Sequence, residues 1–386
     1  MVLASVLQAT FVRKGAEKWT WHHNPLVEMA RGFCFIHRFQ EKIVNNRKIL
    51  SALIVLSIVL IALAACAPAP TRMPIPPAAT TTSVPPTMVS ATMTPTAIPP
   101  TTAPATATPA SVTVIDGANR SVTIVGAPQR IVSLAPSTTE IAFALGLGSR
   151  VVAVDSLSDY PAQVKDLPKI KTYPLNFEQV VSFKPDLVLA AAIQSPDDIK
   201  KLADLKLTVL VVGAQVTTFD SVMSDIAMVG KATGTEAAAK TLTDAMKQKI
   251  DAVKAKIANA KTKPRVYWEL DATDPAKPYA PGPGSFINDI ITLDGGVNVT
   301  ASAKSAYPQV NAEEIVAANP EVIILSDAAY GTTVESVKAR PGWSVIDAVK
   351  HNKVFPIDDN LVSRPGPRIV DGLEAAAKLI HPEVFQ

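Results

Sequence analysis

The stretch "NFEQVVSFKPDLVL" at residues 176–189 is repeated in outline 135 residues later as "NAEEIVAANPEVII" at residues 311–324. Each stretch predicts a short helix that begins after an asparagine and is followed by a buried strand. Identical residues hold the same places in both stretches: Asn176 and Asn311, Glu178 and Glu313, Pro185 and Pro320. The chain therefore contains one helix–strand element twice, which predicts two related lobes.

The segments around this element alternate between strand and helix patterns. Residues 111–126 alternate apolar and polar positions around a Gly-Ala-Asn turn, which predicts a β-hairpin. Ser137 or Thr138 is expected to cap the helix that follows the first buried strand. Further strands are predicted at 130–134, 151–156, 186–191, 207–212, 265–270, 321–326 and 353–357, and helices at 176–183, 196–204, 285–293, 311–318, 334–339 and 367–379. Such alternation indicates an α/β fold with mostly parallel sheets.

A long apolar stripe interrupts the alternation. Residues 235–262 contain neither Gly nor Pro, and their apolar residues recur at helical spacing: Leu242, Met246, Ile250, Val253 and Ile257. A helix of about 26 residues would span roughly 40 Å, enough to connect two lobes. We therefore expect an N-terminal lobe at 111–233, a linking helix at 234–263 and a C-terminal lobe at 264–386.

The N-terminal residues have the pattern of a secretory signal. Residues 49–65 are almost wholly apolar, follow Arg47 and Lys48, and end at Cys66 in the letters "LAAC". These letters resemble the lipobox of bacterial lipoproteins, in which the cysteine is lipidated and becomes the new N-terminus. The alternative is an uncleaved transmembrane helix, for which 17 residues is the short limit. The 48 residues before the apolar run are long for a signal, and Met29 is an alternative start.

Residues 66–110 predict an extended tether after the lipidated cysteine. Residues 67–110 contain 12 Pro and 12 Thr, and Arg72 is their one charged residue. Such a composition cannot bury a core and favours polyproline II. Without residues 1–65 the chain keeps 29 basic and 31 acidic residues. This balance does not favour a nucleic-acid partner.

Glu178 and Glu313 have two explanations. An acid in the first turn of a helix stabilises the helix dipole, at about 0.3–1 kcal/mol. Alternatively, one acid at the same place in each lobe could bind a two-fold symmetric partner such as a dimeric membrane protein.

The residues for catalysis or metal binding are sparse. The two cysteines, Cys34 and Cys66, form no disulfide framework, and His351 and His381 are the only histidines after the signal. Zinc or manganese sites usually need several histidines. We find no nucleophile elbow, P-loop or metalloprotease motif, and "GPGSF" at 282–286 predicts a loop that ends in a helix cap at Ser285.

Several blocks in order resemble one family. They include "RIVSLAPSTTEIAFALGLGSRVVAVDSLSDYP" (130–161), "APGPGSFINDIITLDGGVNV" (280–299), "RPGWSVIDAVKHNKVFPID" (340–358) and "RPGPRIVDGLEAAAKLIHP" (364–382). Over about residues 112–386 the chain is similar to the ABC-transporter substrate-binding proteins for cobalamin, ferric siderophores and haem, and most similar to the cobalamin branch.

The resemblance implies two α/β lobes joined by one rigid helix, with the ligand in a cleft between them. It also implies that an exposed glutamate on each lobe, here Glu178 and Glu313, docks arginines of the dimeric permease. Positions where the cobalamin branch has cleft aromatics correspond to Leu157, Tyr173 or its neighbour, Ala191, Leu270 and Tyr307. A cleft arginine corresponds to Arg364, and a position that can hold an acid corresponds to Asn360. Pro136 and Ser137, at a helix N-terminus, could meet a polar ligand edge with backbone N–H groups.

We therefore expect a monomeric, lipid-anchored extracytoplasmic protein, without a cofactor, that delivers a corrinoid to an ABC permease dimer and its ATPase. A ferric siderophore is the alternative ligand. Haem is disfavoured because no Tyr/His axial pair stands in the cleft segments. An enzyme, and a surface sensor or adhesin that binds without transport, are the alternative classes. Each candidate ligand residue also has a structural alternative: Tyr307 could pack a loop, and Arg364 could pair with an acid.

Overall fold

The computed structural model of the chain describes residues 110–213 and 216–386. The predicted signal at 1–65, the lipidated Cys66 and the tether up to residue 109 lie outside the described residues, so these predictions are untested. None of the helices in the described ranges is both long enough and apolar enough to cross a bilayer.

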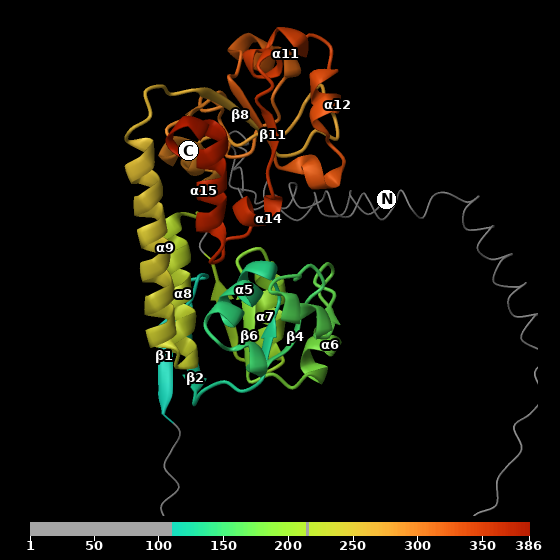
Figure 1. Ribbon diagram of the computed structural model, residues 1–386. Helices are drawn as coiled ribbons and strands as arrows, with labels where there is room; N and C mark the ends of the chain where they lie inside the picture. The colour runs from blue at the N-terminus through green and yellow to red at the C-terminus, as the bar shows by residue number, and fades with distance from the viewer. Residues whose placement is uncertain (1–109, 214–215) are drawn as a thin grey trace, which may run out of the picture. The chain divides into compact units, whose positions relative to one another are not determined.

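We call the part with the five-stranded sheet the N-terminal lobe (Figure 1). Its strands are all parallel, in the order β5-β4-β3-β6-β7. The strands are β3 (Ile131–Ser133), β4 (Val151–Asp155), β5 (Lys169–Ile170), β6 (Leu187–Ala191) and β7 (Val209–Val212). The helices are α5 (Pro136–Ala144), α6 (Phe177–Ser182), α7 (Pro196–Asp204) and α8 (Phe219–Thr233). The predicted hairpin is confirmed as β1 (Ser111–Ile115) paired antiparallel with β2 (Ser121–Val125).

The part with the four-stranded sheet is the C-terminal lobe, whose strand order is β11-β10-β8-β9, again all parallel. The strands are β8 (Arg265–Glu269), β9 (Val297–Asn298), β10 (Val322–Leu325) and β11 (Val354–Pro356). The helices are α10 (Phe286–Leu293), α11 (Ala312–Ala318), α12 (Val334–Lys338), α13 (Asp347–Lys350), α14 (Asp359–Val362) and α15 (Ile369–Ile380). The prediction of two α/β lobes with parallel sheets is confirmed.

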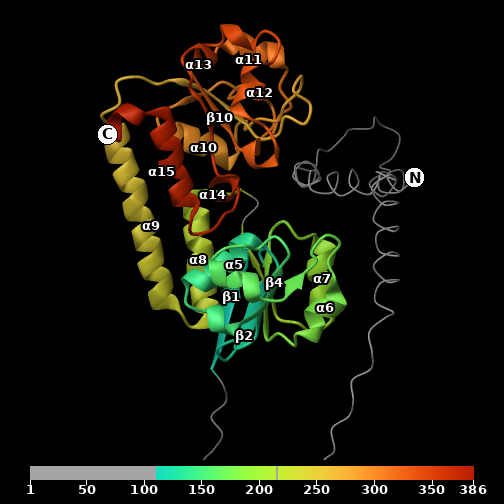
Figure 2. The same ribbon diagram turned by 45° about the vertical axis from the view of Figure 1, so that its right-hand side comes forward.

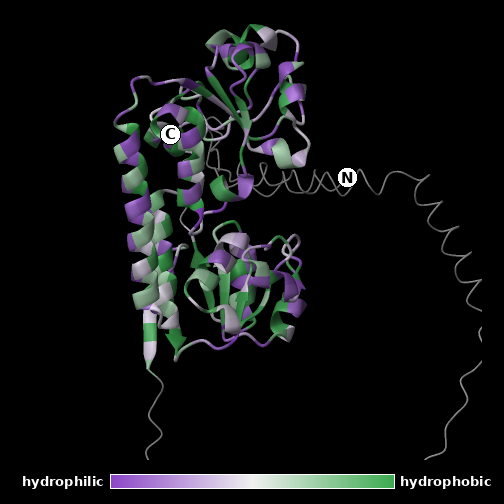
Figure 3. Cartoon of the chain, viewed as in Figure 1, coloured by the Kyte–Doolittle hydropathy of each residue, from purple (hydrophilic) through white to green (hydrophobic). Residues whose placement is uncertain are grey.

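The long helix is shorter than predicted and has a partner that the sequence did not reveal. Helix α9 (Glu236–Ile257) has 22 residues, roughly 33 Å, and packs along α8 (Figure 2). Gly234 has a left-handed φ of 72°, which ends α8 and allows the chain to turn into α9. A Cβ on Gly230 would lie 2.5 Å from the Cβ of Ala239, so glycine permits this close packing. Met246 and Ile250 are buried, whereas the outer face of α9 is hydrophilic (Figure 3).

The internal repeat extends beyond the helix–strand element. Arg130 precedes β3 and Arg265 begins β8, again 135 residues apart. The backbone N–H of Arg130 donates to the Asp186 carboxylate at 2.9 Å, and that of Arg265 donates to Glu321 at 3.0 Å. Asp186 and Glu321 both follow the repeated proline. The two lobes therefore fix the start of their central strands with the same arrangement of side chains.

The turn before each repeated proline is also shared. Lys184 and Asn319 both adopt left-handed backbone conformations, with φ of 48° and 45°. This conformation is uncommon for residues other than glycine. The guanidinium Nε of Arg130 donates to the Lys184 carbonyl at 3.2 Å, and that of Arg265 donates to the Asn319 carbonyl at 3.0 Å. The same backbone strain and the same arginine support occur in both lobes, which confirms that the repeat is structural.

Two predictions about helix caps need correction. Helix α5 is not capped by Ser137 or Thr138, because it begins at Pro136 and its N-cap, Ala135, has no side-chain cap. Proline suits this first position since it lacks an N–H and its φ is already helical. In α6 and α11 the asparagine caps are confirmed, as Asn176 and Asn311 accept backbone N–H groups.

Gln179, three residues after Asn176, could complete a capping box in the sequence, but no such box forms at the start of α6. The Gln179 side chain would have to return to the backbone of Asn176, but its amide donates to the Lys169 carbonyl at 2.7 Å instead. The described contacts likewise include no bond from the Glu314 side chain back to Asn311. The residues of a capping box are present in the sequence, but in the N-terminal lobe the Gln179 side chain bonds Lys169 instead of the backbone of its own helix cap.

Asp294, which follows α10, is fully buried and neither of its carboxylate oxygens has a hydrogen-bond partner among the described residues. Burial raises its pKa to about 9. The folded chain therefore keeps a proton that the unfolded chain releases near pH 4. This contribution to stability is complete below pH 4 and is lost as the pH rises toward 9.

We expect Asp294→Asn to be more stable than the wild type at pH 8, by about 1 to 2 kcal/mol. The gain is limited because the buried amide also lacks hydrogen-bond partners. Denaturant unfolding at pH 4.5 and pH 8 measures it, with Asp289→Asn on the same helix as the control. An equal effect at both pH values would show that Asp294 does not titrate in this way.

Candidate functional site

Polar side chains gather where the parallel strands end, the edge at which open α/β sheets hold ligands. In the N-terminal lobe, Ser133 ends β3 and Asp155 ends β4, and both are buried. In the C-terminal lobe, Glu269 ends β8, and Asp327 follows β10. The described residues form one compact unit, and loops from these two edges touch each other.

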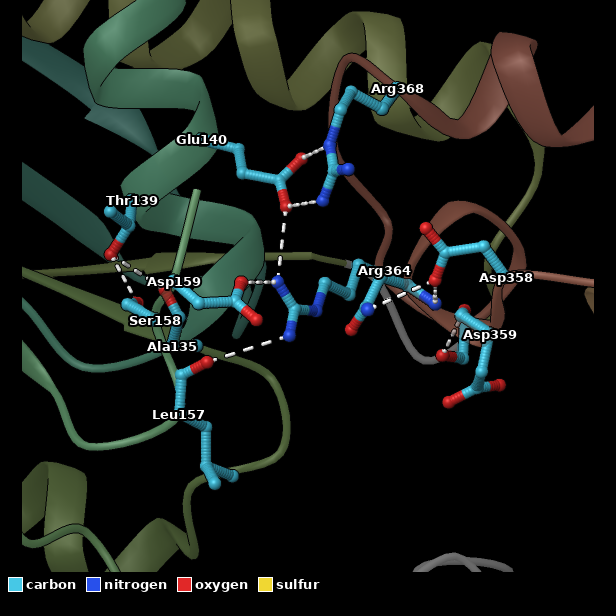
Figure 4. A network of polar contacts seen from close by, with 12 residues as sticks. Ala135, Thr139, Glu140, Leu157, Ser158, Asp159, Asp358, Asp359, Arg364 and Arg368 are labelled. Carbon is cyan, nitrogen blue, oxygen red and sulfur yellow. Dashed lines mark hydrogen bonds and ion pairs between the residues drawn. The ribbon is translucent and has the colours of Figure 1, made fainter. Parts of the chain in front are cut away.

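Glu140 is the centre of this contact, which we call the lobe junction (Figure 4). Its side chain, on α5, is only 2% exposed. Arg368 reaches it from the C-terminal lobe, with Nε 2.9 Å from Oε2 and Nη2 2.6 Å from Oε1. Arg364 adds a longer contact from Nη1 to Oε1 at 3.4 Å. A buried carboxylate is thus neutralised by guanidinium groups of the other lobe, as burial of a charge requires.

The segment "RPGPR" at 364–368 brings both arginines to Glu140. It lies directly on α5, since a Cβ on Gly366 would be 3.5 Å from Glu140 Oε2 and 3.5 Å from the Ser137 carbonyl oxygen. Apolar contact joins the lobes as well, where the Phe219 and Phe286 rings have centroids 4.7 Å apart. The junction therefore combines close backbone packing with buried charge.

Arg364 is also bound by the loop after β4. Its Nη1 lies 2.6 Å from Asp159 Oδ1, and its Nη2 lies 3.4 Å from the Leu157 carbonyl oxygen. Burial alone would raise the pKa of Asp159, but the hydrogen bond and positive charge of Arg364 outweigh it and lower that pKa. Asp159 is therefore ionised at neutral pH. Arg364 pairs with acids here, as the structural alternative expected, and its contact with a ligand stays a prediction.

Hydroxyl groups hold the N-terminal side of the junction in place. The Thr139 hydroxyl donates to Ser133 at 2.8 Å and lies 2.8 Å from the Ser158 hydroxyl. Ser158 in turn donates to Asp155, whose pKa is raised by burial. Strand β3, helix α5 and the loop after β4 are linked by this chain of bonds.

The structure separates the predicted ligand residues into accessible and buried ones. Three have exposed side chains: Leu157, Tyr173 and Tyr307. Burial and the charges of Asp155 and Asp198 raise the pKa of the Tyr173 hydroxyl to about 12, so it stays a neutral donor. Burial also raises the pKa of Tyr307.

The other predicted residues are less available. Ala191 is buried at the end of β6, and its N–H donates to the Gln194 side chain at 2.6 Å. Leu270 packs against the core, Ser137 is buried, and the Asn360 amide donates to Asp358 at 3.0 Å. Pro136 lies at the start of α5. Shallow surface hollows beside the hairpin and along α9 contain none of these residues.

Sequence reasoning missed several residues at the junction. Glu140, Asp159 and Arg368 were not singled out, nor were two exposed tyrosines. The Tyr160 ring lies under the Arg368 guanidinium at 4.0 Å, and the Tyr330 hydroxyl bonds Asp359. A usable signal was present: a glutamate within the apolar run "EIAFA" and two arginines flanking Pro-Gly-Pro.

Glu178 and Glu313 occupy the first turns of α6 and α11, and both are exposed. Neither takes part in an ion pair within residues 110–213 and 216–386. Their docking role stays a prediction. Among the same residues, no three His, Cys, Asp or Glu side chains gather in a way that could hold a metal ion.

The chain has two α/β lobes with parallel sheets, a long helix between the lobes, and loops at the strand ends that touch each other. This architecture is that of a solute-binding protein. The chain belongs to the periplasmic binding protein family, whose model matches residues 131–361. It is a substrate-binding protein of an ABC importer. As a member of a periplasmic family, it acts outside the cytoplasm. It is not an enzyme, because proteins of this family bind solutes and catalyse no reaction.

Similar proteins agree on the class and differ in ligand. An uncharacterized ABC transporter substrate-binding lipoprotein of Bacillus subtilis, YvrC, is 39% identical over 71% of this chain and 87% of its own. A vitamin B12-binding protein of Vibrio cholerae is 29% identical over 64% of this chain and 87% of its own. A possible iron-binding (periplasmic solute-binding) protein of Staphylococcus epidermidis is 30% identical, has a TM-score of 0.59, and covers 66% of this chain and 99% of its own.

Proposed function

We propose that the chain captures a corrinoid and delivers it to the permease dimer of an ABC importer while anchored to a membrane through lipid on Cys66. The observation that carries the proposed ligand is the set of exposed tyrosines at the strand ends of both lobes. Tyr160 and Tyr173 belong to the N-terminal lobe, and Tyr307 and Tyr330 to the C-terminal lobe. These are four of the six tyrosines in the chain.

Tyrosine suits a large flat ligand with a polar edge. Its ring packs on apolar surface while its hydroxyl binds amide or water groups. A corrin has such a surface and a rim of amides. Leu157, exposed in the same loop as Tyr160, adds apolar area. Tyr173 and Tyr307 stand where the cobalamin branch has cleft aromatics, and Tyr160 and Tyr330 would add aromatic surface that Leu157, Ala191 and Leu270 do not supply. The vitamin B12-binding relative supports the same ligand.

A ferric chelate is the alternative ligand, and the similarity to the possible iron-binding protein favours it. Tyrosine hydroxyls also suit the polar surface of such a chelate. Corrinoid and chelate differ in charge and size, so direct titration separates them.

Calorimetric titration of the purified protein with cyanocobalamin tests the proposal. We expect saturable binding in the nanomolar to micromolar range. Tyr173→Ala should weaken binding by roughly fivefold or more, because an exposed ring that packs on a ligand contributes about 1 kcal/mol or more. Tyr279→Ala, in the loop after β8, is the control. Fluorescence is a poorer readout, since Trp268 and Trp343 are buried in the C-terminal lobe. Absence of heat with cyanocobalamin, together with saturable binding of a ferric siderophore, would move the ligand to the chelate class.

A further inference from the structure

The guanidinium groups at the lobe junction are committed to acids of the chain itself. Arg368 donates to both oxygens of Glu140 and lies over the Tyr160 ring. Arg364 has side-chain exposure of 15% and donates to Glu140, to Asp159 and to a backbone carbonyl. The two positive charges are therefore matched by two negative charges within hydrogen-bond distance.

More acids lie beside this balanced set. Asp358 and Asp359 approach from α14, and both act electrostatically on the junction: Asp358 on Arg368 and Asp359 on Tyr330. Burial raises the pKa of Asp359, while Asp358 is exposed and caps α14. Including Asp155 at the end of β4, acids outnumber bases around the two arginines. Lys169 also acts on Asp155, but its ammonium group donates to the Ser158 and Val164 carbonyl oxygens. Among the described residues, the positive charges around the junction are therefore already bonded within the chain.

Of the two acids paired with Arg364, Asp159 is the one whose carboxylate a ligand could displace. Its side chain is 59% exposed, whereas Glu140 is 2% exposed. An anionic ligand could bind Arg364 only by displacing the Asp159 carboxylate or by accepting its repulsion. An uncharged or cationic ligand meets no such penalty.

We propose that Asp159 is a charge-selectivity residue, which occupies the ligand-facing side of Arg364 and makes the site favour ligands that are neutral or positive at the edge near the lobe junction over anionic chelates. This inference rests on the proposed function and narrows its ligand class. Removing the Asp159 charge while keeping its shape should expose the Arg364 charge and admit an anion.

The test compares the wild type, Asp159→Asn and Asp244→Asn. Asp244 is the matched control, because it is 56% exposed and pairs with Lys240 at 2.7 Å on α9, away from the junction. The ligands are cyanocobalamin and a cyanocobalamin monocarboxylate, in which one peripheral amide is hydrolysed to a carboxylate. We expect Asp159→Asn to improve the affinity for the monocarboxylate relative to cyanocobalamin by about tenfold, the size expected for one partly screened charge pair.

A second measurement is independent of the corrinoid. Citrate, a small trianion, should raise the melting temperature of Asp159→Asn more than that of the wild type or Asp244→Asn. If cyanocobalamin binds none of the proteins but citrate stabilises Asp159→Asn selectively, the proposed ligand fails and the role of Asp159 stands. If Asp159→Asn changes both corrinoid affinities equally, or citrate shifts all three proteins equally, the charge-selectivity proposal is overturned.

Discussion

Replacing both Glu178 and Glu313 with alanine is expected to leave ligand affinity unchanged and to abolish uptake. Both carboxylates are exposed in the first turns of α6 and α11, and the described part of the chain offers them no ion-pair partner. A permease dimer that presents one arginine to each would form two charge-assisted hydrogen-bonded pairs. Each such pair contributes about 1.5–3 kcal/mol, so the loss of both lowers docking by more than a hundredfold.

The alternative explanation, stabilisation of the helix dipole, predicts a different outcome. It would reduce stability by about 0.3–1 kcal/mol for each glutamate and leave transport at saturating ligand almost unchanged. The matched control is Asp197→Ala with Glu314→Ala, because these acids are also exposed and also occupy first helical turns. The dipole explanation predicts equal effects for the two double variants.

Uptake of labelled ligand by cells that lack their own copy, together with calorimetric affinity of each purified variant, separates the explanations. Normal uptake by the Glu178 and Glu313 double variant would remove both residues from the docking surface. A loss of ligand affinity in that variant would instead place them in the binding site.

Much of the fold could be predicted because it depends on local patterns. The repeat at 176–189 and 311–324 identified α6 with β6 and α11 with β10. Both strands are fully buried, and so are Val180 and Ile315 on the helices, whereas Val181 is exposed. Helix α7 was predicted at its observed bounds, since Ser195 caps it, proline begins it and its amphipathic pattern is regular. Short elements such as β5 and β9, with two residues each, have no pattern long enough to detect.

The lobe junction could not be predicted in the same way. Glu140 and Arg368 are 228 residues apart, and neither has a local partner that would mark it as buried. Asp159 was part of a recognised block, but its pairing with Arg364 depends on how the two lobes meet. Local sequence predicts elements, whereas a contact between lobes depends on the packing of every element between them.

Glu140→Ala is expected to destabilise the protein by about 3 kcal/mol, because it leaves Arg368 and part of Arg364 buried without a counter-charge. The loss should be largely recovered when Arg368→Ala is added, since the double variant removes both charges. Glu269→Ala is the control, because Glu269 is equally buried and pairs with Arg340 at 2.5 Å, but wholly inside the C-terminal lobe.

The two variants should have similar unfolding free energies and different effects on lobe geometry. Spin labels at positions 178 and 313, in a chain with Cys34→Ser and Cys66→Ser, report the distance between the lobes. We expect Glu140→Ala to broaden that distance distribution and Glu269→Ala to leave it narrow, because only Glu140 joins α5 to the segment before α15. A narrow distribution in both would show that α8, α9 and the Phe219–Phe286 contact hold the lobes without the junction. A broad distribution in Glu140→Ala alone would mean that Glu140 sets the distance at which Glu178 and Glu313 are presented to the permease.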